Sequence, residues 1–168
     1  MGNLAIIYRS LGKHADAEKL KIKVLDMRNR LLGEEHPDTV AAMDAEKLQI
    51  KVLAMRNRLL GEEHPDTISA MGNLANTYAC LGRYADAKKL QIKVLHMRNR
   101  LLGEEHPAII SAMNSLAATY DYLGKYPDAE KLQIQVLDMD RRLLGEEHPN
   151  TIIAMGNLAI IYKSLGKD

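Results

Sequence analysis

Leu101-Leu102-Gly103-Glu104-Glu105-His106-Pro107 occurs four times in this chain, with other copies beginning at Leu31, Leu59 and Leu143. The second and third intervals between copies are equal, whereas the first is one third shorter. Each copy joins a glycine, which commonly ends a helix, to a proline, which is favoured in the first turn of the next helix. The spacing predicts an array of helical units with a period of about 42 residues, in which one unit is truncated.

Each full unit is predicted to form two helices. After Pro65, apolar residues recur every three or four positions as far as Leu81, and Gly82 follows as a helix end. A second helical pattern over residues 84–102 carries two adjacent apolar stripes, which indicates packing against two partner helices. No segment shows the alternation typical of a strand, and such wide apolar faces require the units to stack. The sequence therefore predicts an all-α solenoid of antiparallel helix pairs.

The short unit is expected to fuse its two helices into one. After Met43 the equivalents of residues 72–85, which include the turn between the helices, are missing. No glycine or proline lies between Pro37 and Gly61, and the loss of two heptads preserves the apolar phase. We predict one continuous helix over residues 38–60. Because an array alternates helix direction, this fused helix is expected to reverse every helix that follows it.

These boundaries divide the chain into two predicted regions. Residues 1–60 hold the first repeat and the truncated repeat with its fused helix, and residues 61–168 hold two further repeats and a solitary helix over 150–165. The solitary helix and the fused helix are each expected to expose an apolar side, which usually marks an interface. We therefore expect a homo-oligomer, most simply a two-fold dimer that could exchange the terminal helix between protomers. The alternative is that both faces are covered within one chain.

Composition and charge restrict the class of protein. With 46% apolar residues, 27% charged residues and a net charge of +1, the chain resembles an average globular protein and offers no electrostatic footprint for nucleic acid or anionic lipid. It has no run of about 20 apolar residues and no basic segment followed by an apolar run at its N-terminus. We expect neither a membrane span nor a secretory signal. The single cysteine, Cys80, excludes an intrachain disulfide and fits a cytoplasmic protein.

No pattern of catalytic or cofactor-binding residues is found. The repeat equivalents of Cys80 are Ser10, Tyr122 and Ser164, and a position that accepts such different side chains does not indicate a nucleophile. The recurring Glu-Glu-His lacks the spacing that places metal ligands on one helix face, so the histidine is expected to shape the linker before the proline. These linker histidines are His36, His64, His106 and His148. We predict a protein that is not an enzyme and has no cofactor and no metal site.

The stretch Asn73-Leu74-Ala75-Asn76-Thr77-Tyr78, followed by Leu81-Gly82-Arg83-Tyr84 and Asp86-Ala87, resembles the tetratricopeptide repeat (TPR) signature. In that family small residues lie where paired helices cross most closely, and Ala75 and Ala87 match these positions. The period and the linker resemble the longer repeats of kinesin light chains, and similar units form the C-terminal arrays of fungal STAND (NLR-like) receptors. The resemblance covers essentially the whole chain. It departs at the truncated unit and at Val94 and Val136, where the family usually has alanine.

The resemblance implies a protein–protein interaction scaffold whose first helices line a concave face for an extended peptide or a partner helix. Asn3, Asn73 and Asn157 match asparagines with which kinesin light chain-type repeats contact a peptide backbone, although Ser115 interrupts the series. A side-chain amide can pair with both N–H and C=O groups, whereas the alternative is that these amides are merely solvated. The candidate binding residues are Asn3, Arg9, Asn73, Asn76, Asn114 and Asn157.

Two other functional interpretations remain open at this point. Met1 begins inside a first helix and Asp168 precedes an expected second helix, which favours a self-assembling structural protein or an engineered or truncated array. The other interpretation is a ligand-sensing repeat segment of a larger STAND-type NTPase receptor. A protein or peptide partner is expected in each case, because the sequence contains no catalytic pattern and binding through the protein surface is the function that remains.

Overall fold

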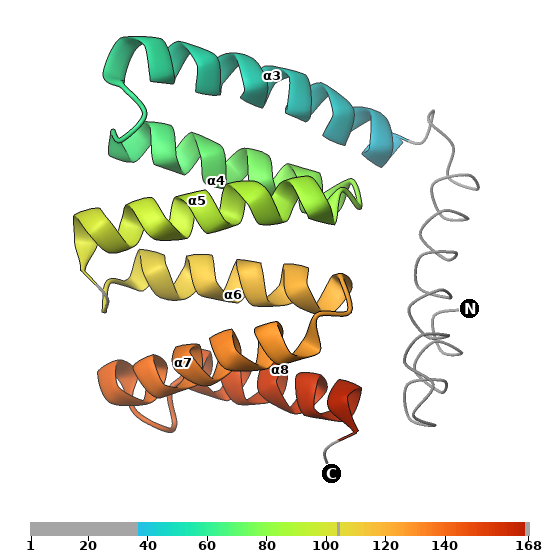
Figure 1. The fold of residues 1–168 in the computed structure, drawn as a ribbon, viewed down its shortest axis with the longest axis vertical. Coiled ribbons are helices and arrows are strands. Elements are labelled where there is room, and N and C mark those ends of the chain that lie inside the picture. Colours follow the sequence, from blue (N-terminus) through green and yellow to red (C-terminus); the bar gives the residue numbers. More distant parts are fainter. Residues whose placement is uncertain (1–36, 104, 167–168) are drawn as a thin grey trace.

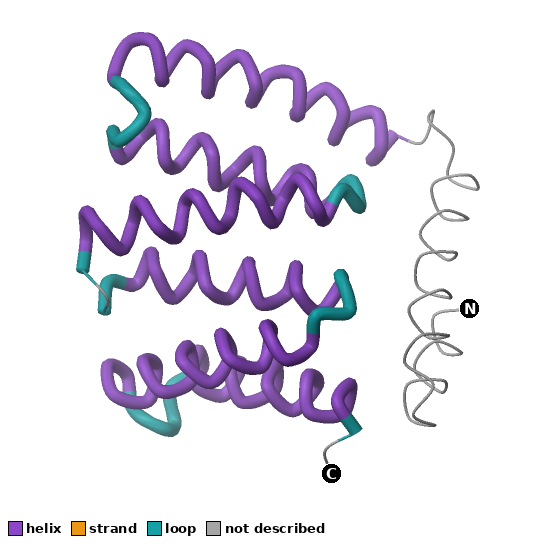
Figure 2. Tube along the Cα trace, viewed as in Figure 1, coloured by secondary structure: helices purple, strands orange, loops and turns teal. Residues whose placement is uncertain are grey.

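The computed structural model describes residues 37–103 and 105–166. Within this part the chain forms six helices joined by short loops (Figures 1 and 2), which confirms the predicted all-α class. The helices are α3 (Pro37–Leu60), α4 (Pro65–Cys80), α5 (Tyr84–Leu102), α6 (Pro107–Tyr122), α7 (Tyr126–Leu144) and α8 (Pro149–Leu165). They stack in chain order, so α3 and α8 lie at opposite ends (Figure 1).

The recurring linker acts as both a helix stop and a helix start. Its glycine takes a positive φ, which ends the preceding helix at no steric cost, as at Gly61, Gly103 and Gly145. The histidine then caps the next helix: Nδ1 of His106 accepts a hydrogen bond from the backbone N–H of Ala108 at 3.1 Å. His64 and His148 make the same contact, which confirms the structural role predicted for these histidines. His36 lies outside the described residues.

The truncated unit is a single helix, as predicted. α3 runs without interruption for 24 residues, from Pro37 to Leu60, and packs against α4. The other predicted helix bounds hold to within one residue: the first helix of the following unit ends at Cys80 rather than Leu81, and the terminal helix begins at Pro149. The predicted reversal compares α3 with residues upstream of it, which lie outside the described residues.

The core lies where second helices are held between two first helices. In one cluster Ile68 and Met71 of α4 and Ala112 of α6 pack with Val94 and Met97 of α5. A second cluster joins α6, α7 and α8 through Ile109, Ile110, Met113, Val136, Leu137, Ala154 and Leu158. The predicted packing of each second helix against two partners is therefore confirmed for α5 and α7, although Ile92 and Leu102 of the apolar pattern on α5 are exposed. Ala75 and Ala87, predicted at the closest helix crossing, are both fully buried.

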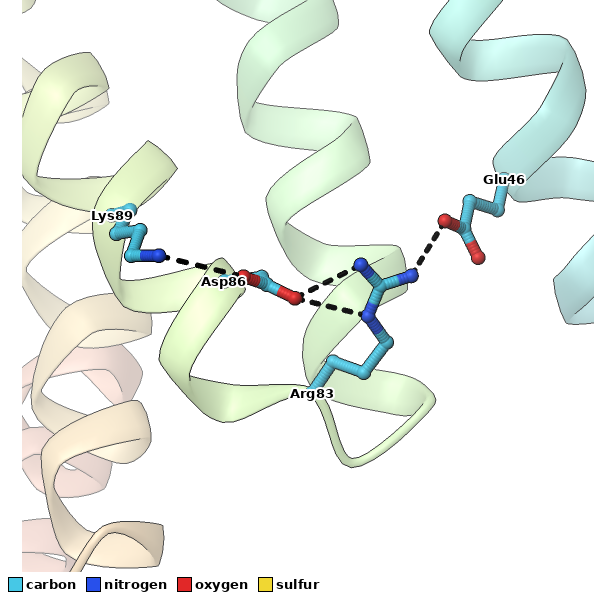
Figure 3. Close-up of polar contacts among 4 residues, drawn as sticks. All are labelled: Glu46, Arg83, Asp86 and Lys89. Atoms are coloured by element: carbon cyan, nitrogen blue, oxygen red, sulfur yellow. Dashed lines mark hydrogen bonds and ion pairs between the residues drawn. The ribbon is translucent and has the colours of Figure 1, made fainter.

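A cluster of ion pairs connects α3 to the turn between α4 and α5. Arg83, in the turn between α4 and α5, donates to Oε1 of Glu46 on α3 at 2.7 Å and to Oδ2 of Asp86 at 2.9 Å (Figure 3). The hydrogen bond to Asp86 is the main reason that the pKa of Arg83 is raised. Lys89 approaches the other oxygen of Asp86 at 3.8 Å (Figure 3). Because Arg83, Asp86 and Lys89 are in contact with solvent, the cluster orients α3 on the turn but adds little free energy.

Candidate functional site

A hollow of about 260 Å³ lies between α4, α5 and α6. The two first helices, α4 and α6, contribute most of its lining, and α5 contributes the rest, which we call the base of the hollow. The lining residues are Ser69, Gly72, Asn73, Asn76, Gln91, Val94, Arg98, Ser111, Ala112 and Ser115. Most of these side chains are hydroxyls or amides, so the hollow presents both hydrogen-bond donors and acceptors.

The structure brings two of the predicted binding residues into this hollow and leaves the others elsewhere. Asn73 and Asn76 are exposed on α4 and line it together. Asn114 of α6 does not line it, and its Oδ1 is buried without a hydrogen-bond partner among the described residues. Asn157 is half-buried on α8, away from the hollow. Asn3 and Arg9 lie outside the described residues.

Two side chains at the base of the hollow were missed from the sequence. Arg98 Nη1 donates to the backbone carbonyl of Ala108 at 2.8 Å, and burial lowers the pKa of its guanidinium, which nevertheless stays charged. Gln91 is only 5% exposed, and its Oε1 has no hydrogen-bond partner among the described residues. The repeat equivalent Gln133 instead donates to Ala154 O at 3.4 Å. The available signal was a glutamine that recurs at the same place in three of the four second-helix sequences, inside an apolar stripe.

α7 and α8 depart from this pattern at the equivalent positions. Asp140 of α7 takes the place of Arg98 and is almost completely buried. Burial raises the pKa of its carboxyl group, and the nearby charge of His148 partly opposes this shift. On α8, Ile160 replaces Asn76 and is exposed. The position of Asn76 is therefore polar on α4 and apolar on α8.

No chemistry beyond binding is apparent in the described part of the chain. There, no group of three or more His, Cys, Asp or Glu side chains could hold a metal ion. Cys80 is exposed at the end of α4, outside the hollow. None of the described helices combines the length and the apolar character needed to cross a membrane. The hollow can hold a ligand through hydrogen bonds, and Arg98 adds a positive charge to it.

Comparison with known proteins supports the same interpretation. Tetratricopeptide repeat family models match residues 43–95, 69–142 and 122–168, and a further tetratricopeptide repeat model matches residues 1–38. A search of curated proteins gave no match.

The solved structures that resemble the chain in fold include three with TPR-like or related descriptions. Two are described as kinesin light chain nearly identical TPR-like repeats from Podosopora anserina, one of them carrying a point substitution. Both are 26% identical, with TM-scores of 0.66 and 0.65, and the match covers 99% of this chain and 85% of theirs. BtubC (BKLC) from P. vanneervenii is 22% identical, with a TM-score of 0.70, over 98% of this chain and 71% of that one. At 22% identity, the similarity to BtubC supports a shared fold and no comparison of function.

Proposed function

This chain belongs to the tetratricopeptide repeat family, and from that premise we propose that it is a non-catalytic scaffold that binds an extended peptide on its concave face. Repeats of this family mediate protein–protein interactions, and kinesin light chain-like folds are generally scaffolds rather than enzymes. The observation that carries the proposal is the hollow, which Asn73 and Asn76 line together with Gln91, whose Oε1 has no hydrogen-bond partner among the described residues.

The chemistry of the hollow favours a peptide backbone as the ligand. A buried acceptor without a partner costs free energy, so a ligand N–H that reached Gln91 would relieve this cost. Asn73 and Asn76 can each donate to a carbonyl and accept from an N–H. Arg98 is the only charged residue among those that line the hollow, so acidic peptides should bind better than basic ones.

The proposal is tested by selecting peptides from a random library for binding to the full chain and measuring their affinity for variants of it. Asn73→Ala should weaken the selected peptide by about 1 kcal/mol, or about fivefold in Kd, the scale of one lost hydrogen bond. Asn99→Ala is the matched control, since Asn99 is exposed on α5 and does not line the hollow. Unchanged affinity in both Asn73→Ala and Gln91→Ala, with native circular dichroism, would place binding on another face.

Self-association is a second candidate function, because apolar side chains are uncovered on α3 and α8. Val52 and Met55 on α3 and Ile152 and Ile160 on α8 are all more than 40% exposed. Such faces support a homo-oligomer, for which a two-fold dimer with an exchanged terminal helix is the simplest form. Light scattering of the full chain over a concentration series tests this, and a constant monomer mass would reject it.

Several finer expectations accompany these proposals. We expect a cytoplasmic protein with protein or peptide partners and with no nucleic-acid or membrane partner, on the basis of its net charge and its lone cysteine. The origin as a STAND-type receptor segment or as an engineered fragment stays a prediction. The genomic or transcript context of the coding sequence would distinguish between these two origins.

A further inference from the structure

Successive first helices carry different residues at the repeat positions that line the hollow. Three of these positions hold Ser69, Asn73 and Asn76 on α4, and their equivalents on α8 are Ile153, Asn157 and Ile160. Ile153 is 60% exposed and Ile160 is 57% exposed. By contrast, α4 and α6, which are described over their whole length, expose no large aliphatic side chain. The positions that are polar at the hollow are therefore mainly apolar on α8.

The exposure of Ile153 and Ile160 is a property of their repeat positions. Their equivalents on α6, Ser111 and Ala118, are both exposed, although α7 packs on α6 and α8 packs on α7. The equivalents on α4 are exposed too, with α5 to α8 stacked after them. Successive repeats therefore leave these positions in solvent, and the two isoleucines are exposed for the same geometric reason.

The two isoleucines and an asparagine form one stripe on α8. Asn157 lies four residues after Ile153, and Ile160 lies three residues after Asn157. Side chains at this spacing lie on one face of a helix. Asn157 is half-buried and occupies the repeat position of Asn73. The surface, which we call the α8 stripe, therefore places an amide between two exposed apolar side chains.

We propose that the α8 stripe is a second subsite for the peptide held in the hollow, and that it takes a large apolar side chain of that peptide. The hollow and the stripe occupy the same repeat positions on first helices that follow one another along the stack (Figure 1). An extended chain that crosses α4, α6 and α8 therefore meets both. The inference rests on the proposed peptide binding and adds the place and the chemistry of a second ligand side chain.

Helix packing sets the spacing between the two ligand side chains. Side chains of α4 and α6 meet in one core cluster, and those of α6 and α8 meet in the other. Helices packed in this way lie about 8–10 Å apart, so the α8 stripe is about 15 Å from the hollow between α4 and α6. An extended chain advances about 3.3 Å per residue, and its alternate side chains share a face. The two ligand residues should therefore be about four positions apart, with both side chains towards the protein.

The two subsites select different side chains. Arg98 is the only charged residue that lines the hollow, so the ligand residue there is favoured when it is acidic. On α7 the repeat position of Arg98 holds Asp140, which offers an acidic ligand no positive partner. An apolar ligand side chain that covers Ile153 and Ile160 removes apolar surface from water on both partners. The α8 stripe therefore favours a leucine, isoleucine or aromatic ligand residue over a polar one.

Peptides selected from a random library on the full chain test the proposal. They should be enriched in a large apolar residue about four positions from an acidic one. Ile153→Ser and Ile160→Ala introduce the residues that α6 carries at Ser111 and Ala118, so the repeat pattern already accommodates them. Fluorescence anisotropy of a selected peptide should show about tenfold weaker binding to each variant, because apolar contact is lost. Replacing the apolar peptide residue with serine should have a similar effect on the unmodified chain.

Two comparisons establish that the contact is specific. Ile134→Ser is the matched control, because Ile134 is an exposed isoleucine on α7 whose equivalent Ile92 does not line the hollow. This variant should bind the selected peptide as the unmodified chain does. The serine-substituted peptide should bind Ile153→Ser and the unmodified chain with similar affinity, because the partner of Ile153 is already absent. Native circular dichroism of each variant excludes unfolding as the cause of a loss.

Contrary outcomes separate this inference from the proposed function. If Asn73→Ala weakens the selected peptide but Ile153→Ser and Ile160→Ala do not, the hollow binds peptide and the second subsite is overturned. If none of the three variants weakens it, peptide binding on this face fails as well. A peptide that gains helical circular dichroism on binding is a partner helix, which overturns the extended spacing. If the two isoleucine variants instead abolish self-association in light scattering and leave peptide affinity unchanged, a second copy of the chain covers the α8 stripe.

Discussion

Replacing Asp140 with arginine should restore an interaction that the two earlier repeats possess. Arg56 Nη1 donates to Asp66 O at 2.8 Å, and Arg98 Nη1 donates to Ala108 O at 2.8 Å. Both carbonyls belong to the first turn of the next first helix. At the equivalent position Asp140 is almost completely buried, and an ionised carboxylate has no proton to donate to the carbonyl of Asn150. The substitution therefore exchanges a buried acceptor for a charged donor.

The expected magnitude follows from the same contacts. A hydrogen bond to a charged group contributes about 1.5–3 kcal/mol, and burial of the guanidinium offsets part of this, since burial also lowers the pKa of Arg98. We expect the free energy of unfolding to rise by about 1–2 kcal/mol in Asp140→Arg. In a chain of this length such a gain raises the Tm by about 2–8 °C.

The pH dependence of a second variant, Asp140→Asn, isolates the cost of the buried charge. Burial raises the folded-state pKa of Asp140 above its usual value near 3.8. Its contribution to stability is therefore fully present below that usual value and is lost as the pH rises through the raised pKa. Asp140→Asn should be more stable than the unmodified chain at neutral pH, and the difference should vanish as the pH falls below about 3.8.

Urea denaturation followed by circular dichroism measures both effects. Asp138→Asn is the control, because Asp138 is exposed on the same helix and its ion pair with Arg142 at 3.2 Å should contribute less than about 1 kcal/mol. If Asp140→Arg is no more stable than the unmodified chain, the stabilising role assigned to Arg56 and Arg98 is refuted. A gain in Asp140→Asn that is independent of pH would refute the role assigned to the buried charge.

Two further predictions concern the core and the linkers. Val94→Ala should lower the free energy of unfolding by about 2 kcal/mol, because two buried methyl groups are lost, whereas Val52→Ala at the exposed equivalent should change it by less than about 0.5 kcal/mol in dilute solution. Equal losses in urea denaturation would mean that Val52 is covered in the monomer. His106→Ala should cost about 1 kcal/mol through the lost helix cap, and an unchanged urea midpoint would show that the contact with Ala108 N–H contributes nothing.

The helices of this protein follow from local features of its sequence. Glycines, prolines and apolar periodicity act within a few residues, so the helix bounds could be predicted to within one residue and the fused helix could be recognised from the missing turn. The lining of the hollow could be predicted in part: Asn73 and Asn76 line it because they project from the face of α4 that the repeat pattern identifies. Asn114 lies one position before Ser115, the repeat equivalent of Asn73, and does not line the hollow.

Other properties depend on contacts between helices that are distant along the chain, and only the tertiary structure decides them. Gln91 and Arg98 belong to a second helix, and their place at the base of the hollow depends on how closely α4 and α6 approach α5. The same holds for Val52 and Val94, which have the same residue type and repeat position but opposite burial. Sequence specifies each side chain's face on its helix, whereas burial is a property of the neighbouring helix that covers that face.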